Sequence, residues 1–179
     1  MQQLLIVDGY NLIFSEYSIF TKKTKKKNRV TLSDARETLL EVLSNYASYK
    51  GMLLIIVFDA YKVEGGSENI YKYDRNTEVI YTARNETADT VIERTVHEMR
   101  ERFEIKVATS DKSQQDYILS QGATRFSSRE IWIDIMETDQ KLFNKYIKKK
   151  RSNEPLMNTM NNKTVKILED IRKGLKENE

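Results

Sequence analysis

The sequence predicts an α/β fold with a mostly parallel sheet, and three observations lead to it. Short continuous apolar runs end at aspartates, segments with helical apolar spacing lie between these runs, and the chain shows no internal repeat. Because right-handed crossover connections place helices over a sheet, this alternation implies parallel strands covered on both faces. The 179 residues, 39% of them hydrophobic, are enough for one domain with a sizeable core.

The first part of the chain predicts a strand, helix, strand unit. Residues 4–7 and 52–58 are continuous apolar runs, typical of buried strands. Residues 31–49, between these runs, carry apolar side chains at helical spacing and stop before Gly51, so they predict a helix.

The next segments continue the alternation. We expect a third strand at residues 78–82, a helix over about 88–103 and a fourth strand at 105–109. Ser110 and Asp111 are typical of a helix cap, and the helix that they begin is expected to end at Gly122. A short fifth strand is expected at residues 124–126.

The last part of the chain is predicted to be helical. Ser127 and Ser128 can cap a helix that runs toward Lys150, and Pro155 can open a final helix rich in Lys and Glu. We therefore expect a main domain over residues 1–150. Residues 151–179 are expected to form a polar linker and a C-terminal helix that extend the same domain.

Composition excludes several classes of chemistry. Without Cys, the chain has no thiolate zinc site, iron–sulfur cluster or Cys nucleophile, and its single His excludes two-His mechanisms. No apolar run approaches the roughly 18–20 residues of a membrane-spanning helix, so we expect a cytoplasmic protein without a membrane partner. The net charge of +3 is too small to imply nucleic-acid binding by itself, and no pattern specifies an oligomeric state.

Four aspartates lie at or near the expected ends of strands. Asp8, Asp59 and Asp111 each follow a strand, and Asp89 lies in the first turn of a helix. Ligands of open parallel sheets bind outside the carboxyl ends of the strands, where the sheet can bring these residues together. Converging carboxylates repel one another, and a cation would offset that repulsion. Each aspartate taken alone can equally be a turn or cap residue.

The available side chains favour an oxygen-ligated cation at such a cluster. Mg²⁺ or Mn²⁺ is the natural candidate, because the chain has no thiolate and one His. Such an ion polarises a phosphate oxygen and lowers the pKa of a coordinated water. Hydrolysis of a phosphodiester is therefore the most economical reaction for this pattern.

The aspartates lie in segments that resemble a known family. Residues 4–13 (LLIVDGYNLI) resemble the first motif of the NYN domains, a branch of the PIN-like nucleases. Three later segments follow in the order that this family requires: IVFDA at residues 56–60, ETAD at 86–89 and ATSD at 108–111. The resemblance extends over about the first 150 residues. It is closest to the YacP-like subgroup, which includes ribosome-associated endoribonucleases that cut messenger RNA in the ribosomal A site.

The resemblance implies a PIN-like three-layer sandwich and divalent-metal-dependent cleavage of messenger RNA at the ribosome. It assigns Asp8, Asp59, Asp89 and Asp111 to the metal cluster, and it places Asn11 at the polar position beside Asp8. These five residues form the predicted catalytic set. RNA and the ribosome are partners on the strength of the resemblance alone.

Basic segments are the candidate contacts for RNA or the ribosome. Phosphate contacts there should weaken with salt, although charge runs can also be solvated loops. One cluster precedes the first helix: Lys22, Lys23, Lys25, Lys26, Lys27 and Arg29. The insertion at residues 61–76 is expected to be a mobile loop beside the Asp59 end of the sheet, or else an ordinary surface loop. Its candidate contacts are Tyr61, Lys62, Lys72 and Arg75.

Two other functions remain open from the sequence. A catalytically silent RNA- or ribosome-binding adaptor could keep the scaffold and the basic loops without needing a cation. A metal-dependent hydrolase could act on DNA or on a small phosphoester, because nothing in the basic loops distinguishes DNA from RNA. Retention of all four acidic positions favours the enzyme over the adaptor.

Overall fold

A computed structural model describes residues 1–15, 31–59, 69–110 and 112–138, and it confirms the α/β class. Its six-stranded sheet has the order β3-β4-β2-β1-β5-β6. The strands are β1 (Gln2–Asp8), β2 (Leu53–Phe58), β3 (Asn69–Lys72), β4 (Thr77–Tyr81), β5 (Phe103–Ala108) and β6 (Thr124–Phe126). The helices are α1 (Gly9–Ser15), α3 (Leu32–Lys50), α4 (Ala88–Met99), α5 (Lys112–Ser120) and an unlabelled helix over residues 128–138.

Parallel pairing aligns the carboxyl ends of the central strands. Val7 of β1 lies opposite Ile56 of β2 on one side and Ala108 of β5 on the other. β2 pairs in parallel with β4, and β5 pairs in parallel with β6. β3 is the exception, because it runs antiparallel to β4 at the edge of the sheet. The residues that follow β1, β2 and β5 therefore lie side by side where the carboxyl ends of these strands meet, which we call the carboxyl edge of the sheet.

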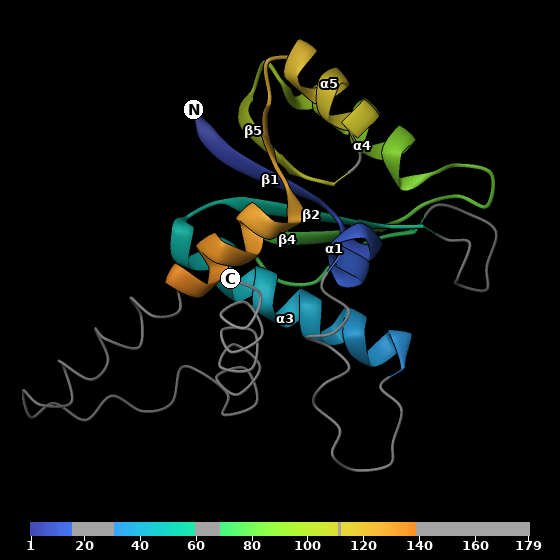
Figure 1. Cartoon of the computed structure of the whole chain (residues 1–179), viewed down its shortest axis with the longest axis vertical. Helices are drawn as coiled ribbons and strands as arrows, with labels where there is room; N and C mark the ends of the chain where they lie inside the picture. Colours follow the sequence, from blue (N-terminus) through green and yellow to red (C-terminus); the bar gives the residue numbers. More distant parts are fainter. Residues whose placement is uncertain (16–30, 60–68, 111, 139–179) are drawn as a thin grey trace, which may run out of the picture.

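Helices cover both faces of the sheet, as Figure 1 shows. Alternate side chains of β1 enter different cores: Leu5 and Val7 pack with residues of α1, α3 and helix 128–138. Leu4 and Ile6 pack on the opposite face with residues of α4 and α5. This arrangement is the predicted three-layer architecture, with β1 buried at its centre.

The helix predicted after residue 31 is confirmed as α3, and its ends show why it forms there. Thr31 and Asp34 form a capping box, in which each backbone N–H donates to the other residue's side-chain oxygen at 2.9 and 3.1 Å. Gly51 ends the helix with a left-handed φ of 69°, which glycine adopts without steric cost. α3 therefore presents one buried face to the sheet.

Three features differ from the sequence-based predictions. α1 follows β1 without a loop and was not predicted. The helix that begins at Ala88 ends at Met99, and not near residue 103 as predicted. Phe103 is instead the first residue of β5, because its apolar side chain fits the pattern of either element. The insertion at residues 61–76 is not loop throughout, because it contains strand β3.

The predicted boundary at residue 150 and the C-terminal helix lie outside the described residues and stay predictions. In the described part of the chain, no helix has both the length and the apolarity to cross a membrane.

Candidate active site

Asp8 is the last residue of the central strand, and it lies at the carboxyl edge of the sheet. One oxygen of its carboxylate, Oδ1, accepts a hydrogen bond of 2.9 Å from the backbone N–H of Asn11. Burial raises the pKa of the Asp8 carboxyl from 3.8 to about 6; the Asn11 bond opposes this shift, and the charges of Asp89 and Asp59 add to it. The fold thus holds a carboxyl in surroundings that disfavour its negative charge.

Asp59 and Asp89 approach Asp8 from the adjoining strand and helix. Asp59 directly follows β2, and its Oδ1 accepts a 2.7 Å hydrogen bond from the backbone N–H of Ala88, the first residue of α4. Thr87 caps this helix by accepting the N–H of Thr90. Asp89 follows in the first turn of α4. The β2 end and the α4 start are therefore joined, which brings the predicted carboxylates toward one region.

A cavity of about 600 Å³ opens where these elements meet. Asp8 and Asp59 both line it. The other lining residues come from α1 and from the segment that joins β4 to α4: Tyr10, Asn11, Phe14, Arg84, Asn85, Glu86 and Thr87. The cavity lies at the carboxyl edge of the sheet, where ligands of parallel sheets bind.

Asn11 is held by a small network of hydrogen bonds. Its Oδ1 accepts from the backbone N–H of Ser110 at 3.1 Å and from the hydroxyl of Ser128 at 3.0 Å. Since the single Ser128 hydroxyl proton is used there, the 2.7 Å contact between the two Ser hydroxyls has Ser110 as its donor. The carbonyl end of the Asn11 amide is therefore fixed, and its NH₂ end is the part that can donate to a ligand.

An aromatic group forms one wall of the cavity. The rings of Tyr10 and Phe14 stack with centroids 5.9 Å apart and an interplanar angle of 23°. The Tyr10 ring also packs edge-to-face with the Phe58 ring, with an interplanar angle of 66° and centroids 5.1 Å apart. Arg36 of α3 donates to the Tyr10 hydroxyl at 3.3 Å. The wall is thus anchored to both β2 and α3.

The chemistry of the donors fits a hard cation. Asp8 and Asp59 line the same cavity, and Asp8 carries a burial penalty that a neighbouring positive charge would relieve. Within the described residues, no three His, Cys, Asp or Glu side chains are gathered into a group that could hold a metal ion. Asp111, the fourth predicted ligand, lies outside the described part of the chain.

Most of the predicted RNA contacts lie outside the described residues: Lys22, Lys23, Lys25, Lys26, Lys27, Arg29, Tyr61 and Lys62. Lys72 and Arg75 are described and exposed, but they are not at the Asp59 end of the sheet. β3 runs back from Asn69, opposite Tyr81, to Lys72, opposite Glu78. The backbone carbonyl of Asn76, next to Arg75, then accepts from Leu54 near the start of β2. The expected position of these two residues was wrong because β3 is antiparallel.

Sequence reasoning missed several residues of the site. Phe14 lies one helical turn after Tyr10, a spacing that indicates a shared helix face once α1 is recognised. Arg84 follows the end of β4, so its position after a strand was an available signal. No local signal connects Ser128 with Asn11, which is 117 positions away.

Comparisons with known proteins agree with this architecture. A family model, the YacP-like NYN domain, matches residues 5–173. The protein YacP of Bacillus subtilis (strain 168) is 34% identical over 173 residues, which are 96% of this chain and 97% of that protein. A crystal structure of Rae1 (YacP) from Bacillus subtilis is similar with a TM-score of 0.65 and 31% identity, covering 99% of this chain and 94% of that chain.

A crystal structure of a mutant of the same Rae1 (YacP) has a TM-score of 0.67 and 29% identity, and the match covers 96% of each chain. The matched residues therefore include those of the sheet and of both helical layers. Since the family model spans far more than half of the residues, the chain belongs to the YacP-like NYN domain family.

Proposed function

We propose that this protein is a divalent-metal-dependent endoribonuclease that cleaves messenger RNA in association with the translating ribosome, at the A site. The observation that carries the proposal is the half-buried Asp8 carboxyl, in surroundings that raise its pKa and in a cavity that it shares with Asp59. A protein that only binds its partner gains nothing from neighbouring carboxylates that repel one another, whereas a hydrolase that uses a cation requires them as ligands.

The residues of the site have separate roles in this proposal. Asp8 and Asp59, which line the same cavity, would hold Mg²⁺ or Mn²⁺, and the family resemblance adds Asp89 and Asp111 to the ligand set. When bound, the cation would polarise a phosphate oxygen and make water a stronger nucleophile. The Asn11 amide, fixed through its Oδ1 by Ser110 and Ser128, would donate to a phosphate oxygen or to the water. Hydrolysis would leave a 5′-phosphate and a 3′-hydroxyl.

The choice of messenger RNA and the ribosome rests on membership in the YacP-like family, and a cytoplasmic location follows from it. The basic residues between α1 and α3, together with Tyr61, Lys62, Lys72 and Arg75, are the proposed contacts to these partners. Lys72 and Arg75 lie toward the end of the strands that is opposite to Asp59. They would therefore contact the partner away from the scissile phosphate.

The test compares cleavage with and without translating ribosomes. Purified protein is incubated with Mg²⁺ or Mn²⁺ and messenger RNA, and new 5′ ends are mapped for the parent, Asp8→Asn and Asp89→Asn. Asp116→Asn is the matched control, because Asp116 is exposed on α5 and does not line the cavity. We expect cuts from the parent and from Asp116→Asn, and strongly reduced cutting by the other two variants.

The alternatives predict different patterns. Cuts in naked RNA that depend on Asp8 and Asp89 would indicate a general ribonuclease and contradict the ribosome requirement. Equal cutting by all variants would overturn the site. RNA or ribosome binding without any Asp89-dependent cut in either setting would overturn the enzyme and favour the catalytically silent adaptor.

A further inference from the structure

We propose that the Phe14 side chain is a stacking site for one unpaired nucleobase of the substrate, which makes the enzyme selective for single-stranded RNA. The inference deepens the proposed function and rests on it for the identity of the substrate. It gives a role to an exposed aromatic ring that the metal chemistry does not use.

The position of Phe14 is the first argument. Its side chain is 47% exposed, although it lines the same cavity as the two carboxylates Asp8 and Asp59. α1 begins immediately after Asp8, so the helix that carries the ring starts at the carboxylate itself. A base stacked on Phe14 would therefore belong to a nucleotide next to the phosphate at Asp8.

The support behind the ring is the second argument. Tyr10 is 5% exposed and lies against Phe14 in a stacked geometry. Tyr10 also meets the Phe58 ring edge-to-face and accepts a hydrogen bond from Arg36. Tyr10 is thus held by groups from β2 and α3, and its stacked neighbour is supported in the same orientation. A supported ring loses little conformational freedom when a base stacks on it.

The composition of the cavity suits a nucleotide as the occupant. A nucleotide combines a planar base with an anionic phosphate, and the cavity offers a planar apolar ring together with Arg84 and the Asn11 amide. Arg84 is exposed, on the segment between β4 and α4 that also supplies Asn85 and Glu86. Stacking on an aromatic ring tolerates any base, because every base has a π-face. A base inside a duplex has both faces covered by its neighbours, so the site would select unpaired RNA.

The first experiment measures binding separately from cleavage. All proteins carry Asp89→Asn, and anisotropy is used to titrate a short labelled oligoribonucleotide in Mg²⁺, either single-stranded or annealed to its complement. Phe14→Ala and Phe14→Leu should raise the Kd for the single strand by about 5-fold or more, whereas Phe14→Tyr should retain parental binding. The Leu variant separates stacking from simple apolar contact.

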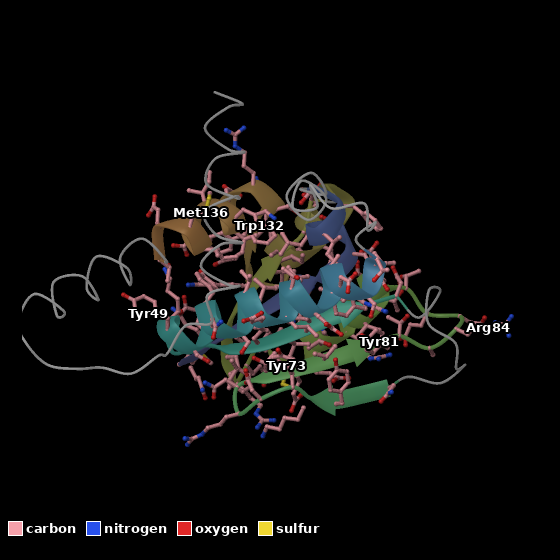
Figure 2. All side chains as sticks on the ribbon, turned by 90° about the horizontal axis from the view of Figure 1, so that it is seen from below. Tyr49, Tyr73, Tyr81, Arg84, Trp132 and Met136 are labelled. Carbon is pink, nitrogen blue, oxygen red and sulfur yellow. The ribbon has the colours of Figure 1, made fainter. Side chains whose placement is uncertain are left out.

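Tyr49→Ala is the matched control. Tyr49 is 44% exposed near the end of α3, and Figure 2 shows it on the opposite side of the molecule from Arg84. Its removal should leave the Kd unchanged. A second readout uses the fluorescence of a Phe14→Trp variant. Trp132 is the single Trp of the chain and is fully buried, so a base cannot stack on it. Quenching of Trp fluorescence that the variant shows and the parent does not would therefore report a base stacked on residue 14.

Three results would overturn the stacking site: unchanged affinity in Phe14→Ala, equal affinity of Phe14→Leu and parent, or a parent that binds the duplex as well as the single strand. These results leave the proposed function intact if cleavage still depends on Asp8. Conversely, if Phe14-dependent binding is found while no variant cuts RNA, the nuclease proposal fails and the binding site stands.

Discussion

At the scale of single residues, the Asn11 side chain is oriented by a hydrogen bond from a buried residue that does not itself line the cavity. Ser128 is 2% exposed, does not line the cavity, and donates to the Asn11 Oδ1 at 3.0 Å. It is a positioning residue, because it acts on a substrate only through Asn11. Its loss would leave the amide with one fixed hydrogen bond, from the Ser110 backbone.

Ser128→Ala is therefore expected to lower kcat about 10-fold with little change in KM, as losing an orienting partner does at other sites. The measurement is steady-state cleavage, with chemical denaturation to follow the stability cost of about 1 kcal/mol. Ser128→Thr retains the hydroxyl and should restore the rate. An Ala variant with parental kcat, or a Thr variant as slow as the Ala variant, would contradict the positioning role.

Asp8 makes a separate prediction about stability in the absence of divalent cations. Its pKa is about 6 in the folded protein, compared with 3.8 for a fully solvated aspartate, so the folded state holds more protons than the unfolded state between these values. The free energy of unfolding therefore decreases as pH rises through this window, by about 3 kcal/mol.

Asp8→Asn removes this pH-dependent penalty. In the presence of a metal chelator, the variant should have a higher free energy of unfolding than the parent above about pH 6. The difference between the two free energies should shrink as pH falls toward about 4. Urea denaturation of both proteins across this range measures it, and titrations elsewhere in the chain cancel in the difference. A difference that stays constant with pH would show that Asp8 does not titrate in this window.

At the scale of elements, the junction of β1 and α1 depends on Gly9. The strand passes directly into the helix, and a Cβ at this position would overlap the Phe58 ring. Gly9→Ala is thus expected to lower stability by about 1–3 kcal/mol, the usual cost of overpacking a core. A double variant with Phe58→Leu should cost less than the sum of the two single changes. Additive costs in chemical denaturation would rule out this overlap as the cause.

Helix 128–138, which supplies Ser128, is linked to α3 through a partly buried polar contact. The Tyr46 hydroxyl donates to Asp134 Oδ2 at 2.5 Å, and Lys50 forms an ion pair with Oδ1 of the same carboxylate at 2.9 Å. Tyr46→Phe removes one of these contacts while the ion pair continues to compensate the Asp134 charge.

We expect Tyr46→Phe to lower the free energy of unfolding by about 1–2 kcal/mol, because a hydrogen bond to a charged group is lost. A double-mutant cycle with Asp134→Asn measures the coupling between the two groups. A coupling energy near zero would mean that the contact does not hold the helix in place.

At the scale of the whole molecule, the sequence predicted those features whose signal is local. Buried strands appear as apolar runs, so the positions of Asp8 and Asp59 at strand ends could be read directly. β3 has four exposed residues and hence no apolar pattern, and α1 is seven residues long, about two helical turns, with apolar residues that continue those of β1. The Asn11–Ser128 contact is nonlocal and depends on β1, β5 and β6 being neighbours.

The same topology predicts that cation binding stabilises the fold globally. β1 is in the middle of the sheet and contributes to both cores, so its end cannot be released without disturbing both layers. A cation that binds the folded site raises the free energy of unfolding by about 1.4 kcal/mol at roughly ten times its Kd. For a chain of this size, that corresponds to a rise in Tm of about 3–6 °C.

Thermal unfolding with added Mg²⁺ or Mn²⁺ measures this rise against a monovalent salt of equal ionic strength. Asp8→Asn should lose most of the cation-specific shift, because the variant lacks a ligand charge at the carboxyl end of the central strand. Asp116→Asn removes a carboxylate from exposed α5 and should keep the whole shift. Equal shifts in all three proteins would place the cation elsewhere on the surface and would separate metal binding from the β1 end.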